Sequence, residues 1–98
     1  MLIFTLLIHT DSINKPSSEL KTVTLDMDKA IDDAKAFIKT KFIQELSVWE
    51  DDWKILNFMF DSSKGKWTRQ LECLKSDEIV EIANQIEQKL NDLVKASE

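Results

Sequence analysis

The sequence has few of the residues that interrupt regular structure, with one glycine and one proline among 98 residues. Because these two residues mark most turns and loops, their scarcity favours long helices and strands over a loop-rich fold. The one glycine, Gly65, also excludes the phosphate-binding loops that need several glycines close together. The common classes of nucleotide-dependent enzyme are therefore excluded.

Cysteine and histidine are equally scarce, with one of each, Cys73 and His9. A single cysteine cannot form a disulfide within the chain, and this pair is too small for a structural zinc site. The composition fits a reducing, cytoplasmic environment. For nucleophilic catalysis the pair is equally weak. Cys73 lies on the apolar side of its expected strand, which favours an inert core thiol, and His9 stands near a strand end, which favours a local hydrogen bond.

Positive charge is in deficit, since 13 Lys and Arg stand against 18 Asp and Glu, a formal net charge of -5. A negative chain gains little from neutralising phosphates, so direct binding of DNA or RNA is not expected. Long apolar runs are also missing. The opening residues 1–10 lack the basic stretch of a signal peptide and fall far short of the ~20 residues that span a bilayer. We expect a buried strand there and no membrane partner.

The apolar pattern predicts two successive strand–strand–helix units within a single domain, residues 1–98. Strands are expected where apolar and polar residues alternate or form short runs, at residues 2–10, 20–25, 54–60 and 67–73. A helix is expected over residues 27–46 with Asp26 as its N-cap, and a second helix after the N-cap Ser76. Each helix has one apolar stripe.

Two helices with one apolar stripe each need a shared apolar surface. The predicted fold is therefore α+β, a two-layer sandwich in which both helices cover one face of a four-stranded antiparallel sheet, in the order ββαββα. The opposite face is expected to carry polar residues and a surplus of apolar ones, namely Thr22, Thr24, Thr68, Gln70, Glu72, Ile3, Leu7, Ile55 and Met59. If that surplus is contiguous, it marks a contact surface.

Two acidic segments suggest a metal or catalytic site but do not have the required spacing. Asp26, Asp28 and Asp32 match the start of a calcium loop. However, Ile31 and Phe37 stand where the glycine and the bidentate glutamate belong. A catalytic carboxylate pair with the later acidic segment lacks any feature that places the two groups across a cleft. The sequence predicts no metal, no cofactor and no enzyme activity.

The stretch VWEDDW, residues 48–53, places two of the three tryptophans around three consecutive carboxylates. Tryptophan is enriched at the residues that dominate interface energetics, and acids beside it steer a basic partner. In the alternative, which is slightly favoured because each large aromatic matters to so small a core, both tryptophans pack inward and the acids form a solvated turn. Within this stretch we expect Trp53 to be the packed anchor and the exposed part to be Trp49, Glu50, Asp51 and Asp52.

The third tryptophan, Trp67, is also open to two interpretations. It shares an expected strand face with Leu71 and Cys73, which favours the core, yet it follows a lysine-rich turn and could lie at the rim of a contact surface. The candidate partner-binding residues are therefore Trp49, Glu50, Asp51, Asp52, Trp53 and Trp67.

Exclusion of these chemistries leaves recognition of another macromolecule. We expect a small, acidic, non-enzymatic protein that binds and inhibits another protein. It would be an inhibitor or immunity-type factor, of the kind that a phage or mobile element carries, whose acidic and aromatic surface covers a basic site on its target. The alternative is a self-associating structural or adaptor subunit that uses an apolar sheet face or an edge strand. A monomer fits the first expectation and a homodimer fits the second.

Overall fold

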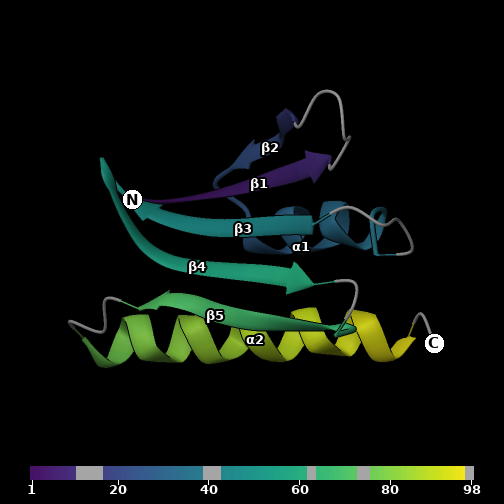
Figure 1. Ribbon diagram of the computed structural model, residues 1–98. Helices are drawn as coiled ribbons and strands as arrows, with labels where there is room; N and C mark the ends of the chain where they lie inside the picture. The colour runs from purple at the N-terminus through teal and green to yellow at the C-terminus, as the bar shows by residue number, and fades with distance from the viewer. Residues whose placement is uncertain (11–16, 39–42, 62–63, 73–75, 97–98) are drawn as a thin grey trace.

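The computed structural model describes residues 1–10, 17–38, 43–61, 64–72 and 76–96 of the chain. Within these ranges the chain forms strands and helices in the order ββαβββα (Figure 1). Their bounds are β1 Leu2–Thr10, β2 Ser17–Thr24, α1 Met27–Lys35, β3 Ile43–Glu50, β4 Trp53–Asp61, β5 Lys66–Glu72 and α2 Asp77–Ala96.

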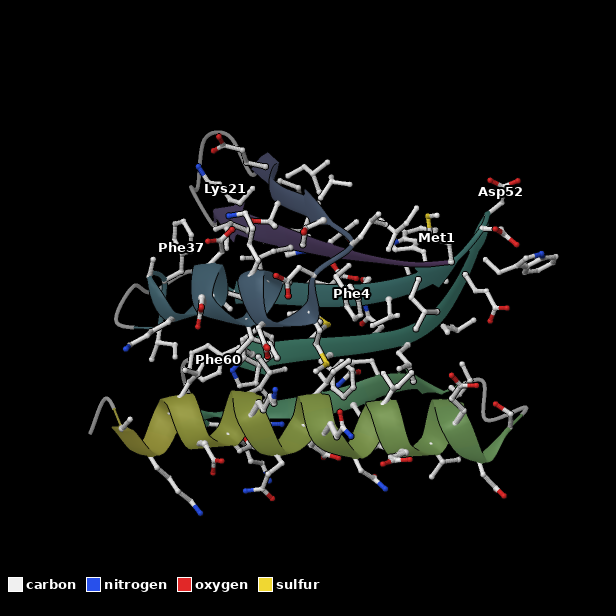
Figure 2. All side chains as sticks on the ribbon, turned by 180° about the vertical axis from the view of Figure 1, so that it is seen from behind. Met1, Phe4, Lys21, Phe37, Asp52 and Phe60 are labelled. Atoms are coloured by element: carbon white, nitrogen blue, oxygen red, sulfur yellow. The ribbon has the colours of Figure 1, made fainter. Side chains whose placement is uncertain are left out.

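The strands form one antiparallel sheet of five strands in the order β2-β1-β3-β4-β5. Both helices lie on the same side of this sheet, as the view from behind shows (Figure 2). The α+β class and the two-layer arrangement are therefore confirmed. The expected four strands and the order ββαββα are wrong, because β3 was assigned to the first helix.

The expected helix of residues 27–46 is confirmed for residues 27–35, where α1 lies, and is wrong for the turn at 36–38 and for residues 43–46. Residues 39–42 lie outside the described part of the chain. Ile43–Glu50 is a strand, and its alternate side chains Gln44, Leu46 and Val48 face the helices. The polar Gln44 breaks the apolar alternation that would have revealed this strand. Leu46 fits a helical stripe as well as a strand, so periodicity alone could not separate the two.

Both predicted helix caps are confirmed. The Asp26 carboxylate accepts hydrogen bonds from the backbone N–H groups of Asp28 and Lys29, at 3.0 and 3.4 Å. The Ser76 hydroxyl oxygen accepts one from the N–H of Ile79, at 3.3 Å. Each cap provides partners for N–H groups that a helix start leaves unpaired.

The hydrophobic core lies between the helices and the covered face of the sheet. Alternate residues of β1 point into it, and the buried residues of α1 and α2 close it from the other side. Trp67 belongs to this core: its side chain is 2% exposed and its ring centroid lies 5.4 Å from that of Phe60. The apolar residues of the core are Phe4, Leu6, Ile8, Ala30, Ile31, Ala34, Leu46, Val48, Ile55, Leu56, Phe58, Phe60, Trp67, Ala83, Ile86 and Leu90.

Register shifts change which residues face outward. The pairing of β1 with β2 shifts between Leu6 and Leu7, so Leu20 lies on the uncovered face while Thr22 points inward. Thr22 is buried and its hydroxyl donates to Asp33 of α1 at 2.7 Å. A similar shift beside Val48 leaves Ile55 buried in the core. Thr24 pairs with the buried Phe4 and lies on the same side as Thr22. The expected outward positions of Thr22, Thr24 and Ile55 are therefore wrong, because a one-residue shift reverses the facing of a strand.

None of the helices in the described part of the chain has the length and apolarity needed to cross a membrane. Cys73, expected to be an inert core thiol, lies outside the described residues.

Replacing Gln44 with leucine should stabilise the fold. Gln44 is 0% exposed, and its amide nitrogen and oxygen have no hydrogen-bond partner among the described residues. Because a buried unpaired amide costs about 1–3 kcal/mol, Gln44→Leu should raise the free energy of unfolding by about that amount, as measured by urea denaturation. The control is Thr22→Val, which removes a hydroxyl that does have a partner and should give no gain. A loss of stability in Gln44→Leu would contradict this interpretation of Gln44.

Candidate functional site

The acidic and aromatic stretch forms the turn between β3 and β4. Glu50 ends β3 and pairs with Trp53, the first residue of β4, so Asp51 and Asp52 form the turn between them. Asp51 has a backbone φ of 53°, in the left-handed region that aspartate tolerates better than most residues. Figure 2 shows Asp52 at the end of this hairpin, with Met1 nearby. We call residues 50–53 the hairpin tip.

The two tryptophans point the opposite way from the sequence expectation. Trp53, expected to be the anchor, is 77% exposed. Trp49, expected to be exposed, is half-buried: its Nε1–H donates to Thr5 Oγ1 at 3.0 Å, and Lys54 Nζ lies 5.1 Å from the ring centroid. The reason is topological. Trp53 begins β4, and the pairing of β4 with its other neighbour β5 starts only at Leu56 in the described residues. Because β1 also begins only at Leu2, opposite Glu50, little of the sheet lies beside Trp53.

The hairpin tip adjoins two hollows in the protein surface. The smaller has a volume of about 180 Å³, and its walls are Glu50, Asp51, Trp53 and Ile55. The larger has a volume of about 300 Å³ and lies between the tip and the first turns of α2, lined by Met1, Leu2, Glu50, Glu78, Ile79 and Ile82. Glu50 therefore stands between a hollow with an aromatic wall and a hollow with aliphatic walls.

The charge around the tip is negative. Glu50, Asp51 and Asp52 are all exposed, and in the part of the chain that is described none of them forms an ion pair. Asp77 and Glu78 add two exposed carboxylates at the start of α2. Their negative charge there interacts favourably with the helix dipole. The hairpin tip thus combines exposed carboxylates with an accessible indole ring.

A second polar group lies on the face of the sheet that the helices leave uncovered, and we call it the open-face network. His9 is at its centre, with Nδ1 2.7 Å from Ser18 Oγ and Nε2 2.9 Å from Glu45 Oε2. Asn57 donates to Glu45 Oε1 at 2.6 Å, and Lys54 Nζ lies 3.7 Å from the same oxygen. The Glu45 carboxylate of β3 therefore contacts groups from β1 and β4, and His9 links it to Ser18 of β2.

The surroundings of Glu45 favour its charged form. Partial burial acts to raise the pKa of Glu45, but the hydrogen bonds from His9 and Asn57 and the charge of Lys54 outweigh it and hold this pKa below the ordinary value of 4.5. Glu45 is therefore ionised at neutral pH and attracts the donors around it.

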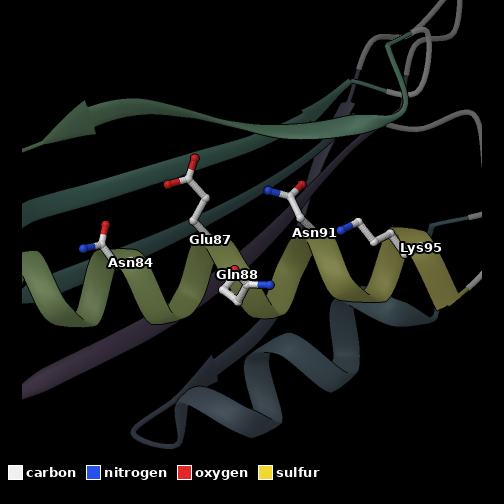
Figure 3. Close-up of a pocket in the computed structure, with 5 residues that line it drawn as sticks. All are labelled: Asn84, Glu87, Gln88, Asn91 and Lys95. Carbon is white, nitrogen blue, oxygen red and sulfur yellow. The ribbon is translucent and has the colours of Figure 1, made fainter.

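A third feature is a polar hollow of about 480 Å³ beside α2, lined by Asn84, Glu87, Gln88, Asn91 and Lys95 (Figure 3). Several of its polar groups already bind β5. Arg69 donates to Glu87 and to Asn84, and the Asn91 side chain accepts from the backbone N–H of Trp67 at 3.4 Å. These contacts hold α2 against the edge of the sheet, which accounts for their presence without a ligand.

The comparisons with known proteins add no family assignment, because no protein-family model, curated protein or solved structure matches this chain. Within the described ranges, no group of three or more His, Cys, Asp or Glu side chains is arranged to hold a metal ion.

Sequence reasoning found the hairpin tip but not the open-face network. VWEDDW is contiguous, so its composition is visible in the sequence. Ser18 follows His9 by nine residues, and Glu45 and Asn57 are much further along the chain. All three are ordinary residues for strands and loops. Only the strand order and register bring them together.

The lowered pKa of Glu45 predicts a pH-dependent contribution to stability. A carboxyl whose pKa is lower in the folded state stabilises the fold above its unfolded value, and this contribution is lost as the pH falls through the folded value. Glu45→Gln should therefore cost about 1–2 kcal/mol at pH 7 and less at about pH 3, in urea denaturation at each pH. The control is Glu50→Gln, an exposed residue that should change little at either pH. An equal cost of Glu45→Gln at both pH values would show that the charge of Glu45 does not contribute.

Proposed function

We propose that this protein works by binding another protein through the hairpin tip, and that it inhibits its target by covering a basic site. The observation that carries the proposal is the 77% exposure of Trp53 beside three exposed carboxylates. Exposure of the apolar indole ring to water is unfavourable, and a partner that covers the ring removes this unfavourable term. Covering it would contribute about 3 kcal/mol before the costs of association.

The surface around Trp53 supports the same function. The hollows on both sides of Glu50 give a partner's side chains places to insert, one beside the indole and one against Leu2, Ile79 and Ile82. The carboxylates would speed association with a positively charged surface and disfavour acidic proteins. Aromatic anchoring and acidic steering would thus act from one tip. The function needs no chemistry from these residues.

Capture from a lysate of the native host tests the proposal. Immobilised wild-type protein and Trp53→Ala should be compared by quantitative mass spectrometry, and the affinity of each enriched protein measured with purified components. We expect a basic partner whose affinity falls thirty-fold or more in Trp53→Ala, the ratio for a loss of about 2 kcal/mol. The partner's own activity should fall when the wild-type protein is added.

Matched variants make the result specific. Leu25→Ala also truncates an exposed apolar residue, one that is 60% exposed and lies outside the tip, and it should leave binding unchanged. Asp51→Asn with Asp52→Asn removes two charges in a turn that asparagine also tolerates, and it should slow association and weaken its dependence on salt. Equal affinity of wild type and Trp53→Ala for every captured protein would refute the role of the tip.

A second candidate function is self-association through the open face of the sheet. Leu20 and Val23 of the edge strand β2 are 53% and 61% exposed. They pair with Leu7 and Thr5 of β1, whose side chains point away from the helices. Leu20, Val23 and Leu7, together with the half-buried Ile3, form an apolar corner. Two copies of the chain can bury such a corner against each other.

Sedimentation at increasing protein concentration tests this second candidate. We expect a monomer–dimer equilibrium that Leu20→Lys with Val23→Lys shifts to monomer, because each copy would bring a charge into the apolar contact. Trp53→Ala is the control and should leave the equilibrium unchanged, since the tip lies outside this corner. A wild-type protein that stays monomeric at every concentration would exclude the candidate.

A further inference from the structure

The open-face network contains a group that the proposed function does not use. Leu2, at the start of β1, pairs with Glu50 of the hairpin tip, whereas His9, near the end of β1, pairs with Ser18 of β2. The strand between them is about 23 Å long at the usual rise per residue. Ser18 and His9 therefore lie far from the hairpin tip, and any function of theirs is separate from it.

His9 is held between a hydroxyl and a carboxylate. With its ring proton on Nε2, the imidazole donates to Glu45 Oε2 at 2.9 Å, and its bare Nδ1 accepts from the Ser18 hydroxyl at 2.7 Å. A nucleophile within hydrogen-bond reach of a base, and a third group that orients the base, are the components of an activated nucleophile. Here Ser18 is the nucleophile, His9 is the base and Glu45 is the group that orients the base.

The two supporting groups are fixed and partly shielded, while the hydroxyl is accessible. Asn57 and Lys54 hold the other oxygen of Glu45, at 2.6 and 3.7 Å. The side chains of His9 and Glu45 are 31% and 19% exposed, whereas Ser18 is an exposed residue of an edge strand. A reagent in solution can therefore reach Ser18 while Glu45 keeps the imidazole oriented.

We propose that Ser18 is a nucleophile activated by His9, and that it takes the acyl group of carboxylic esters at the protein surface. As Ser18 Oγ bonds to the carbonyl carbon, its proton passes to His9 Nδ1. When the bond from that carbon to the leaving oxygen breaks, the imidazolium returns the proton to the leaving group, which departs as an alcohol. Acyl-serine remains, and the ionised Glu45 stabilises the intermediate imidazolium through Nε2–H.

The surroundings of Ser18 indicate the substrate class and limit the rate. The neighbouring pair on the same face is Leu7 with Leu20, and the 53% exposure of Leu20 gives an alkyl or aryl ester an apolar surface to rest on. Water also reaches this surface, so the gain that a closed site gives to acyl transfer is not expected. The expected behaviour is stoichiometric acylation of Ser18 followed by slow hydrolysis.

Reaction with 4-nitrophenyl acetate tests the proposal, at a concentration where sedimentation shows monomer. Nitrophenol release follows the rate, and mass spectrometry of the intact and digested protein locates the acetyl group. We expect one acetyl group per chain on Ser18, while the exposed Ser76, which has no imidazole beside it among its described contacts, stays unmodified and serves as an internal control. Acetylation confined to lysines or to His9 would overturn the proposal.

Variants separate activation from simple exposure. Ser18→Ala should abolish the serine adduct, and His9→Gln should slow its formation by about 100-fold or more, the usual contribution of a general base. Circular dichroism confirms that each variant is folded. Leu25→Ala, at an exposed residue that belongs neither to the hairpin tip nor to the open-face network, should leave the reaction unchanged. Equal rates at Ser18 in wild type and folded His9→Gln would show that Ser18 is not activated.

Glu45 is a positioning residue, and the tautomer of His9 reports on that role. His9 is the chain's one histidine, so its ¹⁵N signals can be assigned without ambiguity. Wild type should show a protonated Nε2 and an unprotonated Nδ1 in the neutral ring, whereas folded Glu45→Gln should show a mixture of tautomers together with slower acylation. An unchanged tautomer with an unchanged rate would remove Glu45 from the mechanism.

Discussion

The burial of one face of the sheet under two amphipathic helices is the interaction on which the rest of the structure depends. Leu6, Leu46 and Phe58 lie at its centre and are at most 1% exposed. Burying a side chain of this size contributes about 1.5–3 kcal/mol, and the core contains many of them. Because strand side chains alternate, fixing one row against the helices assigns the other row to the opposite face.

No helix covers that second row, so its polar and apolar residues contact one another and solvent. Glu45, Asn57 and His9 satisfy one another there, while Leu20 and Val23 remain largely exposed. Antiparallel sheets tolerate a solvated face, so exposure of this face does not by itself indicate a partner. What distinguishes it is the convergence of a hydroxyl, an imidazole and a carboxylate at fixed distances.

The hairpin tip follows from the same architecture in a different way. β3 and β4 reach to the end of β1, so the residues of the turn have neighbours on few sides. Trp53 is exposed because the sheet ends there, and Trp49 is half-buried because it lies within the sheet beside Thr5. The two proposed activities thus occupy opposite ends of β1 and can be separated by mutation.

Much of this protein follows from its sequence. Alternation identified β1 and β5, and a short apolar run identified β4. Cap residues located both helix starts, at Asp26 and Ser76. These signals depend only on neighbours in the chain. The sequence did not predict β3, because the buried polar residue Gln44 interrupts the alternation of apolar residues expected of a strand. Strand order and register decided the remaining features. These are which tryptophan faces outward, which way Thr22 points, and the contacts of His9 with Ser18 and Glu45. These are properties of pairing between distant segments, and local composition does not encode them.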